Sequence, residues 1–62
     1  MMSMPKLVTG ETYVDEEGMS VCIINKSPNP TYCFKGDNGR LYTVNGINML
    51  ESKWNLKENV HA

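Results

Sequence analysis

Turn-forming residues divide this chain at intervals that suit short β-strands better than helices. Clusters of glycine, proline, asparagine and acidic residues recur about every eight to ten positions. They lie at Gly10 and at residues 16–18, 27–30, 36–39 and 45–46. The segments between them are rich in Val, Ile, Thr, Tyr and Phe and contain no internal Gly or Pro: residues 12–15, 19–25, 31–35, 40–44 and 47–50. This spacing predicts five short strands and a small all-β barrel.

The two ends of the chain are expected to be accessory to this barrel. Residues 1–9 are predicted to form an N-terminal arm whose apolar side chains, Met4, Leu7 and Val8, can dock on the domain. In the charged tail, Ser52 can cap a helix over residues 53–58, so the tail predicts either one helical turn or a last edge strand. The expected organisation is an arm over 1–9 and a single small β-barrel domain over 10–60.

Small size limits how much core this domain can build alone. The chain has 62 residues, 40% of them apolar, and a domain of this size buries only about 60% of its unfolded surface. Pairing with a second copy would supply further burial. The net charge of −1 and the pI near 5.6 weigh against a protein that mainly grips nucleic-acid phosphates. Because no apolar run approaches the roughly 18 residues of a membrane span, and no signal-peptide stretch is visible, we expect a soluble cytoplasmic protein that does not bind a membrane.

Hairpin register decides which side chains share a face of the sheet. A loop over residues 26–29 would place Cys22 opposite Cys33, and a turn over residues 36–39 would place Phe34 opposite Leu41. The resulting core face comprises Met19, Val21, Ile23, Tyr32, Phe34, Leu41 and Thr43. The other face comprises Ser20, Cys22, Ile24, Cys33, Lys35, Tyr42 and Val44. This second face is too apolar to be left to water, so the ends of the chain or a partner should cover it.

No group of residues in the sequence predicts catalysis. His61, the only histidine, lies next to the C-terminus, and no serine has the context of an activated nucleophile. Cys22 and Cys33 could form a redox-sensitive disulfide or half of a metal site, but two ligands alone rarely make a site, so two packed thiols are favoured. The acidic stretch 15–17 is expected to be a solvated hairpin tip. We therefore expect no enzyme activity, no cofactor and no metal.

Four short motifs follow one another along most of the chain. They are Gly10-Glu11-Thr12-Tyr13, the turn at Gly18 followed by Val21 and Ile23, the run Tyr42-Thr43-Val44-Asn45-Gly46, and Leu56-Lys57-Glu58. Together they resemble the small SH3-like β-barrel proteins encoded by bacteriophages and prophages, most of which have no known function. The resemblance implies a five-stranded SH3-like barrel with a short C-terminal turn or edge strand. It also implies an accessory protein, made in the cytoplasm of a bacterial host cell, that binds a host or phage component.

The sequence therefore predicts a non-catalytic protein-interaction module, acting on a host component. We expect binding through Lys35, Arg40 and Tyr42 on the second sheet face, or through Pro28 and Pro30 in a loop that two prolines hold rigid. The partner would be a host or phage protein whose identity stays open, and a homodimer is a further option.

Two other classes of function stay open at this point. A nucleic-acid-binding barrel could stack bases on Tyr13, Tyr42 and Trp54, although the acidic balance makes nucleic acid the weaker candidate partner. An enzyme could also build its site at the centre of a homo-oligomer, where a short chain borrows residues from its copies.

Overall fold

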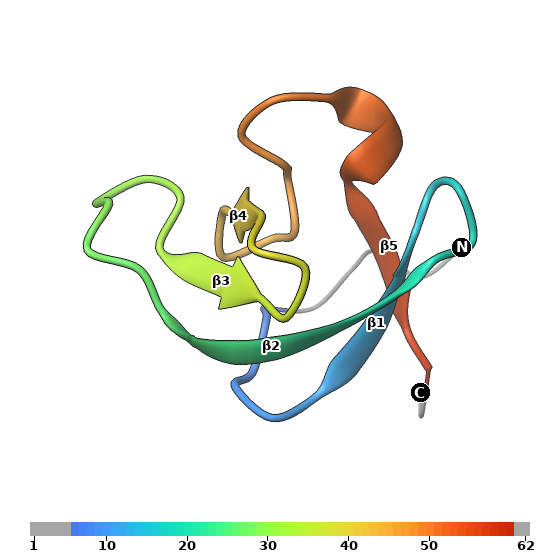
Figure 1. Cartoon of the computed structure of the whole chain (residues 1–62), viewed down its shortest axis with the longest axis horizontal. Helices are drawn as coiled ribbons and strands as arrows, with labels where there is room; N and C mark the ends of the chain where they lie inside the picture. Colours follow the sequence, from blue (N-terminus) through green and yellow to red (C-terminus); the bar gives the residue numbers. More distant parts are fainter. Residues whose placement is uncertain (1–5, 61–62) are drawn as a thin grey trace.

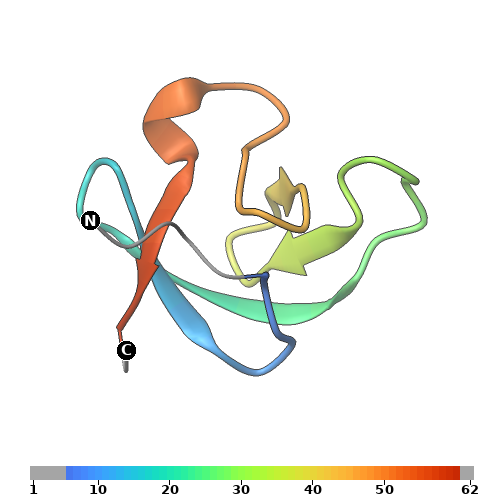
Figure 2. The ribbon, with the colours of Figure 1, turned by 180° about the vertical axis from the view of Figure 1, so that it is seen from behind.

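A single curled antiparallel sheet makes up the fold. The computed structural model describes residues 6–60, so the expectations for Met4 and His61 lie outside the described residues. Five strands follow in the order β1 (Thr12–Asp15), β2 (Ser20–Lys26), β3 (Phe34–Gly36), β4 (Leu41–Tyr42) and β5 (Leu56–Asn59), with a 3₁₀ helix, η1 (Ser52–Trp54), before β5. The spatial order is β4-β3-β2-β1-β5, and the sheet bends into a half-barrel (Figures 1 and 2). The all-β prediction is confirmed over residues 6–60.

The fifth strand is not where the turn spacing placed it. A strand was expected over residues 47–50, but there only Asn48 makes an isolated bridge, to Tyr42. The Asn48 side chain is the reason, because its Oδ1 accepts hydrogen bonds from the backbone N–H groups of Leu50 (2.8 Å) and Glu51 (3.0 Å) and so turns the chain. The tail supplies the last strand instead, as the edge strand β5. The expected Ser52 cap is wrong, because Ser52 lies inside the short 3₁₀ turn η1, whose N-cap is Glu51 and has no side-chain capping bond.

The β2–β3 hairpin is joined by a longer loop than the predicted 26–29 turn. Lys26 pairs with Phe34, so the loop runs over residues 27–33. Side chains hold it: Ser27 Oγ accepts from Asn29 N, and Asn29 Oδ1 accepts from the N–H groups of Thr31 and Tyr32. These bonds occupy amides that the predicted ladder would have used. The facing of Cys22 and Cys33 is therefore wrong, because Cys22 O accepts instead from Asp37 N at 2.8 Å.

The β3–β4 hairpin is shifted by one residue from its predicted register. Phe34 pairs with Tyr42 and Lys35 pairs with Leu41. A one-residue shift exchanges the faces of a strand. Tyr42 is consequently fully buried at 0% exposure, and Leu41 leaves the core for the half-exposed outer side. Of the other residues assigned to the core face, Val21, Ile23 and Phe34 are buried, Tyr32 and Thr43 are half-buried, and Met19 is exposed.

Leu7 and Leu56, from the first and last described segments of the chain, both pack into the core. Leu7 from the arm is buried, and its N–H donates to Val44 O at 2.8 Å. Leu56 at the start of β5 is also buried, and its N–H donates to Gly46 O at 2.8 Å. The predicted docking of the arm is confirmed for Leu7, whereas Val8 is exposed. The core comprises Leu7, Tyr13, Val21, Ile23, Phe34, Tyr42 and Leu56.

Candidate binding groove

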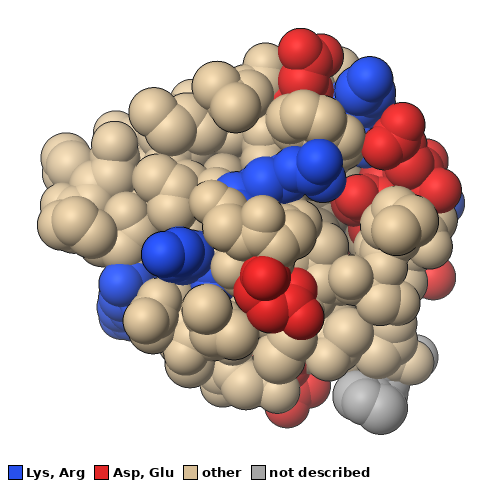
Figure 3. All heavy atoms as spheres, viewed as in Figure 1, with Lys and Arg blue, Asp and Glu red and all other residues tan. Residues whose placement is uncertain are grey.

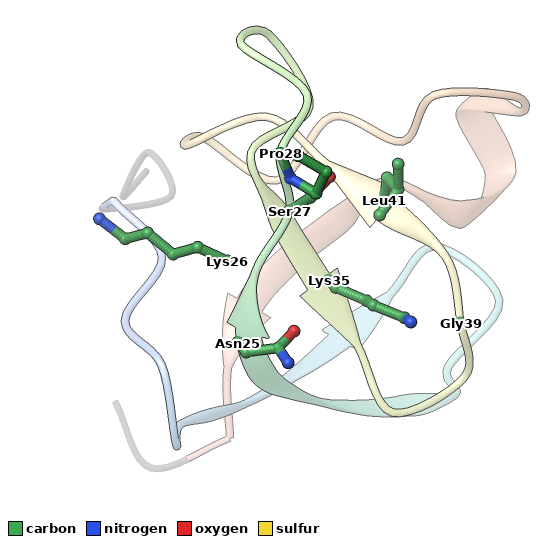
Figure 4. A pocket seen from close by; sticks show the side chains of 7 residues that line it. All are labelled: Asn25, Lys26, Ser27, Pro28, Lys35, Gly39 and Leu41. Carbon is green, nitrogen blue, oxygen red and sulfur yellow. The ribbon is translucent and has the colours of Figure 1, made fainter.

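An open groove of about 520 Å³ lies on the outer face of the sheet, over β2, β3 and β4. Its lining residues are Asn25, Lys26, Ser27, Pro28, Lys35, Gly39 and Leu41. The strand register builds its floor, because Lys35 pairs with Asn25 on one side and with Leu41 on the other. The β2–β3 loop supplies one wall through Ser27 and Pro28, and the β3–β4 turn supplies the other through Gly39 (Figure 4).

The groove has an apolar end and a polar end. Pro28 and Leu41 lie at one end, whereas the Asn25 amide and the Lys35 chain lie together at the other (Figure 4). Lys26 points away from the groove in the same view. Its Nζ instead lies 5.4 Å from the centroid of the Phe34 ring. The charge inside the groove therefore comes from Lys35.

The segment that follows β4 carries exposed apolar side chains, one of them next to Leu41. Met49 lies beside Leu41, because its N–H donates to Leu41 O at 3.1 Å. Met49 is 46% exposed and the neighbouring Leu50 is 74% exposed. Ile47, on the same segment, is also exposed. Apolar side chains adjoining a groove are a typical feature of surfaces that bind other molecules.

The structure brings together two of the five residues that the sequence singled out for binding. Pro28 and Lys35 line the same groove, whereas Pro30 is exposed in the β2–β3 loop and does not line it. Arg40 is only half-exposed and stacks on another side chain. The expectation that Tyr42 lies on an exposed face is wrong, because the register shift turns it into the core.

Five of the seven lining residues were not predicted as binding residues, among them Leu41 and Asn25. Leu41 was assigned to the core, and Asn25 was treated only as the end of a strand. The position of Leu41 could have been inferred only with the correct register of the β3–β4 hairpin, since the sequence places apolar residues at both 41 and 42. The groove thus depends on a pairing detail that hydrophobic alternation alone does not determine.

Arg40, the other basic residue that was predicted to bind a partner, is part of a stacked cluster. The Arg40 guanidinium lies 3.6 Å from the centroid of the Trp54 ring, and Lys53 Nζ lies 5.6 Å from it. Trp54 Nε1 donates to Glu17 Oε1 at 3.2 Å. These contacts join the end of the β3–β4 turn, η1 and the β1–β2 turn. Arg40 and Trp54 therefore stabilise the positions of three loops and are not an open stacking platform.

The interior of the fold also contains polar groups, including those of Tyr42 and Asp15. Burial raises the pKa of the Tyr42 hydroxyl above the usual tyrosine range, although the hydrogen bond from Asn38 Nδ2 (3.1 Å) and the Arg40 charge act in the opposite direction. Asp15 is fully buried, and its Oδ1 accepts from the N–H groups of Glu17 and Met19 at 2.9 Å each. Within residues 6–60, no hydrogen-bond donor contacts Asp15 Oδ2. Asp15 thus caps the β1–β2 turn from inside the fold, so the expectation of a solvated tip is wrong for Asp15, whereas Glu16 and Glu17 are exposed.

Charge is distributed unevenly over the surface. Figure 3 shows the largest group of acidic atoms at the right, toward the β1–β2 turn, and smaller groups at the top, lower middle and bottom of this face, whereas its left end, toward the β2–β3 loop, carries basic atoms and no acidic ones. In the part of the chain that the structure describes, no three His, Cys, Asp or Glu side chains converge as a metal site. Cys22 and Cys33 are both free, half-buried thiols. No helix over residues 6–60 has the length and hydropathy needed to cross a membrane.

Comparisons with protein-family models, with curated proteins and with solved structures return no match to this chain.

Proposed function

We propose that this chain is a non-catalytic protein-interaction module built on an SH3-like barrel. The strand connections support the SH3-like assignment, because the β1-to-β4 meander is followed by a 3₁₀ turn and a last strand that returns to pair with β1. That order of elements is the one that the sequence resemblance implies. Fold alone does not define function, so the functional proposal rests on the groove.

The groove carries the proposal because it joins three properties of a binding surface at one place. It is concave, it contains the exposed cation Lys35, and its apolar lining residue Leu41 adjoins Met49, whose side chain is exposed. Exposed apolar area beside a defined concavity marks partner-binding surfaces on small soluble domains. The proposed setting, a phage accessory protein in the cytoplasm of a bacterial host cell, rests on the sequence resemblance alone.

A comparative pull-down tests this function. Tagged wild-type protein, Lys35→Glu and Lys57→Glu would each be incubated with a bacterial lysate, and the captured proteins would be identified by mass spectrometry. Lys57 is the matched control, since it is exposed on β5, does not line the groove, and undergoes the same change of charge. The proposal requires a protein that wild type and Lys57→Glu retain and that Lys35→Glu loses.

The same set of captured proteins for all three chains would contradict a role for the groove. Cooperative urea unfolding of Lys35→Glu, followed by the fluorescence of Trp54, ensures that a loss of capture does not reflect a loss of fold. Trp54 is suited to this because it is the only tryptophan in the chain.

A further inference from the structure

We propose that the groove binds an acidic protein segment in extended conformation, with one aliphatic side chain against Pro28 and Leu41 and a carboxylate on Lys35. This inference rests on the proposed interaction function and specifies the chemistry of the partner. It assigns the two ends of the groove to two side chains of the same segment.

Charge complementarity selects an acidic segment. Lys35 is exposed, and within residues 6–60 it makes no ion pair. The Lys35 ammonium points toward Gly39 and away from its strand partner Asn25, so the charge that a carboxylate would meet in the groove is the Lys35 ammonium alone (Figure 4). The acidic β1–β2 turn lies at the other end of the molecule (Figure 3). A basic segment in the groove would meet a like charge, and a neutral one would cover the ammonium without pairing it.

The apolar end of the groove selects an aliphatic side chain. Its walls are the Pro28 ring and the Leu41 side chain, and no aromatic side chain from residues 6–60 lines the groove. Grooves that bind proline-rich helices are lined by aromatic rings, so this groove lacks the chemistry for a polyproline ligand. Leucine, isoleucine or methionine would bury its apolar surface there and would extend the contact toward Met49, which lies next to Leu41.

The strand register sets the spacing of the two recognised side chains. Lys35 and Leu41 are cross-strand partners, and the Cβ atoms of such pairs lie about 5 Å apart. In an extended segment, side chains on one face are two residues and about 7 Å apart. The length of the Lys35 side chain covers the difference. The bound segment should therefore carry an aliphatic and an acidic residue separated by one residue. The direction in which the segment runs along the groove decides which of the two comes first.

Fluorescein-labelled peptides test this specificity directly. Two probes carry Leu-Ser-Glu or Glu-Ser-Leu in a Gly-Ser frame, and two control probes carry lysine in place of glutamate. Binding to the full chain would be measured by fluorescence polarisation at low salt. We expect one acidic probe to bind at least about tenfold more tightly than its lysine counterpart, and to lose about tenfold in affinity with Lys35→Glu, because a charge-assisted hydrogen bond is lost. Lys35→Gln should weaken binding less, and Lys57→Glu should leave it unchanged.

Each other outcome overturns the inference in a recognisable way. Equal binding of the lysine probes, or no binding of any probe while the pull-down still depends on Lys35, refutes the acidic segment but leaves the interaction function standing. No probe binding together with a pull-down that is insensitive to Lys35→Glu refutes both. Lys35-dependent binding of a ten-nucleotide oligothymidylate, without peptide binding, would assign the groove to single-stranded nucleic acid instead.

Discussion

Replacing Asp15 with alanine should destabilise the fold by about 3 kcal/mol, whereas asparagine at the same position should cost about 1 kcal/mol or less. Asp15 Oδ1 accepts two backbone hydrogen bonds, from Glu17 and Met19. Hydrogen bonds to a charged group contribute about 1.5–3 kcal/mol each. The lower end applies here, because the residues whose amides lose their acceptor are themselves exposed, so water can reach the turn.

The Asp15→Asn variant tests the hydrogen-bond acceptor at Oδ1 separately from the charge of the carboxylate. It keeps an oxygen at the Oδ1 position and removes a buried negative charge whose Oδ2 has no hydrogen-bond partner within residues 6–60. The gain from removing this charge offsets most of the cost of placing an amide nitrogen at the Oδ2 position. The two substitutions should therefore differ clearly, even though both remove the same carboxylate.

Urea unfolding at pH 7, followed by Trp54 fluorescence, measures both variants. A domain of this size has a total stability of about 3–9 kcal/mol and an m-value of about 1 kcal/mol/M. The Asp15→Ala midpoint should consequently fall by about 3 M, to the point where part of the population is unfolded in water, and the Asp15→Asn midpoint by about 1 M or less. Equal losses for both variants would refute the turn-capping role, and so would an unchanged midpoint for Asp15→Ala.

Three further substitutions test other parts of the structure. Gly36→Ala should lower the urea midpoint by about 1–3 M, because a Cβ at this position would lie 2.5 Å from Val21 Cγ1. Overpacking of this kind costs about 1–3 kcal/mol. An unchanged midpoint would contradict this packing. Burial raises the pKa of Tyr42, so the stability linked to its protonated form is present below about pH 10 and is lost as the pH rises above it. Tyr42→Phe should therefore lose less stability than wild type between pH 9 and pH 11, and parallel losses would speak against the raised pKa. Arg40→Gln removes a stacked cation from the Trp54 ring. It should therefore shift the fluorescence emission maximum of Trp54 to longer wavelength and lower the free energy of unfolding by about 0.5–1 kcal/mol. An unchanged emission maximum would show that the stack does not form in solution.

The strands that the sequence predicted well are those bounded by glycine turns. β1 was placed over the same residues as observed, and β2 within one residue at each end. Gly10 and Gly18 flank β1 with φ values of 95° and 83°, a backbone conformation that few other residues adopt. Turn positions of this kind are visible in the residue type itself, so they could be located without knowledge of the fold.

The pairing of those strands could not be predicted, because side-chain hydrogen bonds determine it. Asn29 and Asn48 each bind backbone amides two and three residues further along. The first of them lengthens the β2–β3 loop and the second ends the expected strand over residues 47–50. Asparagine is equally compatible with a tight hairpin turn, so its presence does not show which amides it will bind.

The candidate site was consequently predicted only in part. Pro28 was predicted to bind because it lies in a rigid loop, and Lys35 because it is an exposed cation. Both residues line the same groove. Tyr42 and Leu41 exchanged faces because of a one-residue register shift. That shift turned an expected surface tyrosine into the core and placed a leucine in the groove. The apolar end of the site therefore became visible only with the structure.

Amide chemical-shift mapping of the ¹⁵N-labelled full chain, titrated with the acidic peptide that binds more tightly, tests the groove most directly. The largest changes should occur at the amides of Asn25, Lys35 and Leu41, whereas the amides of Val14 on β1 and Glu58 on β5 should keep their chemical shifts. Largest changes over β1 and β5, or around Trp54, with unchanged shifts in the groove, would contradict binding in the groove.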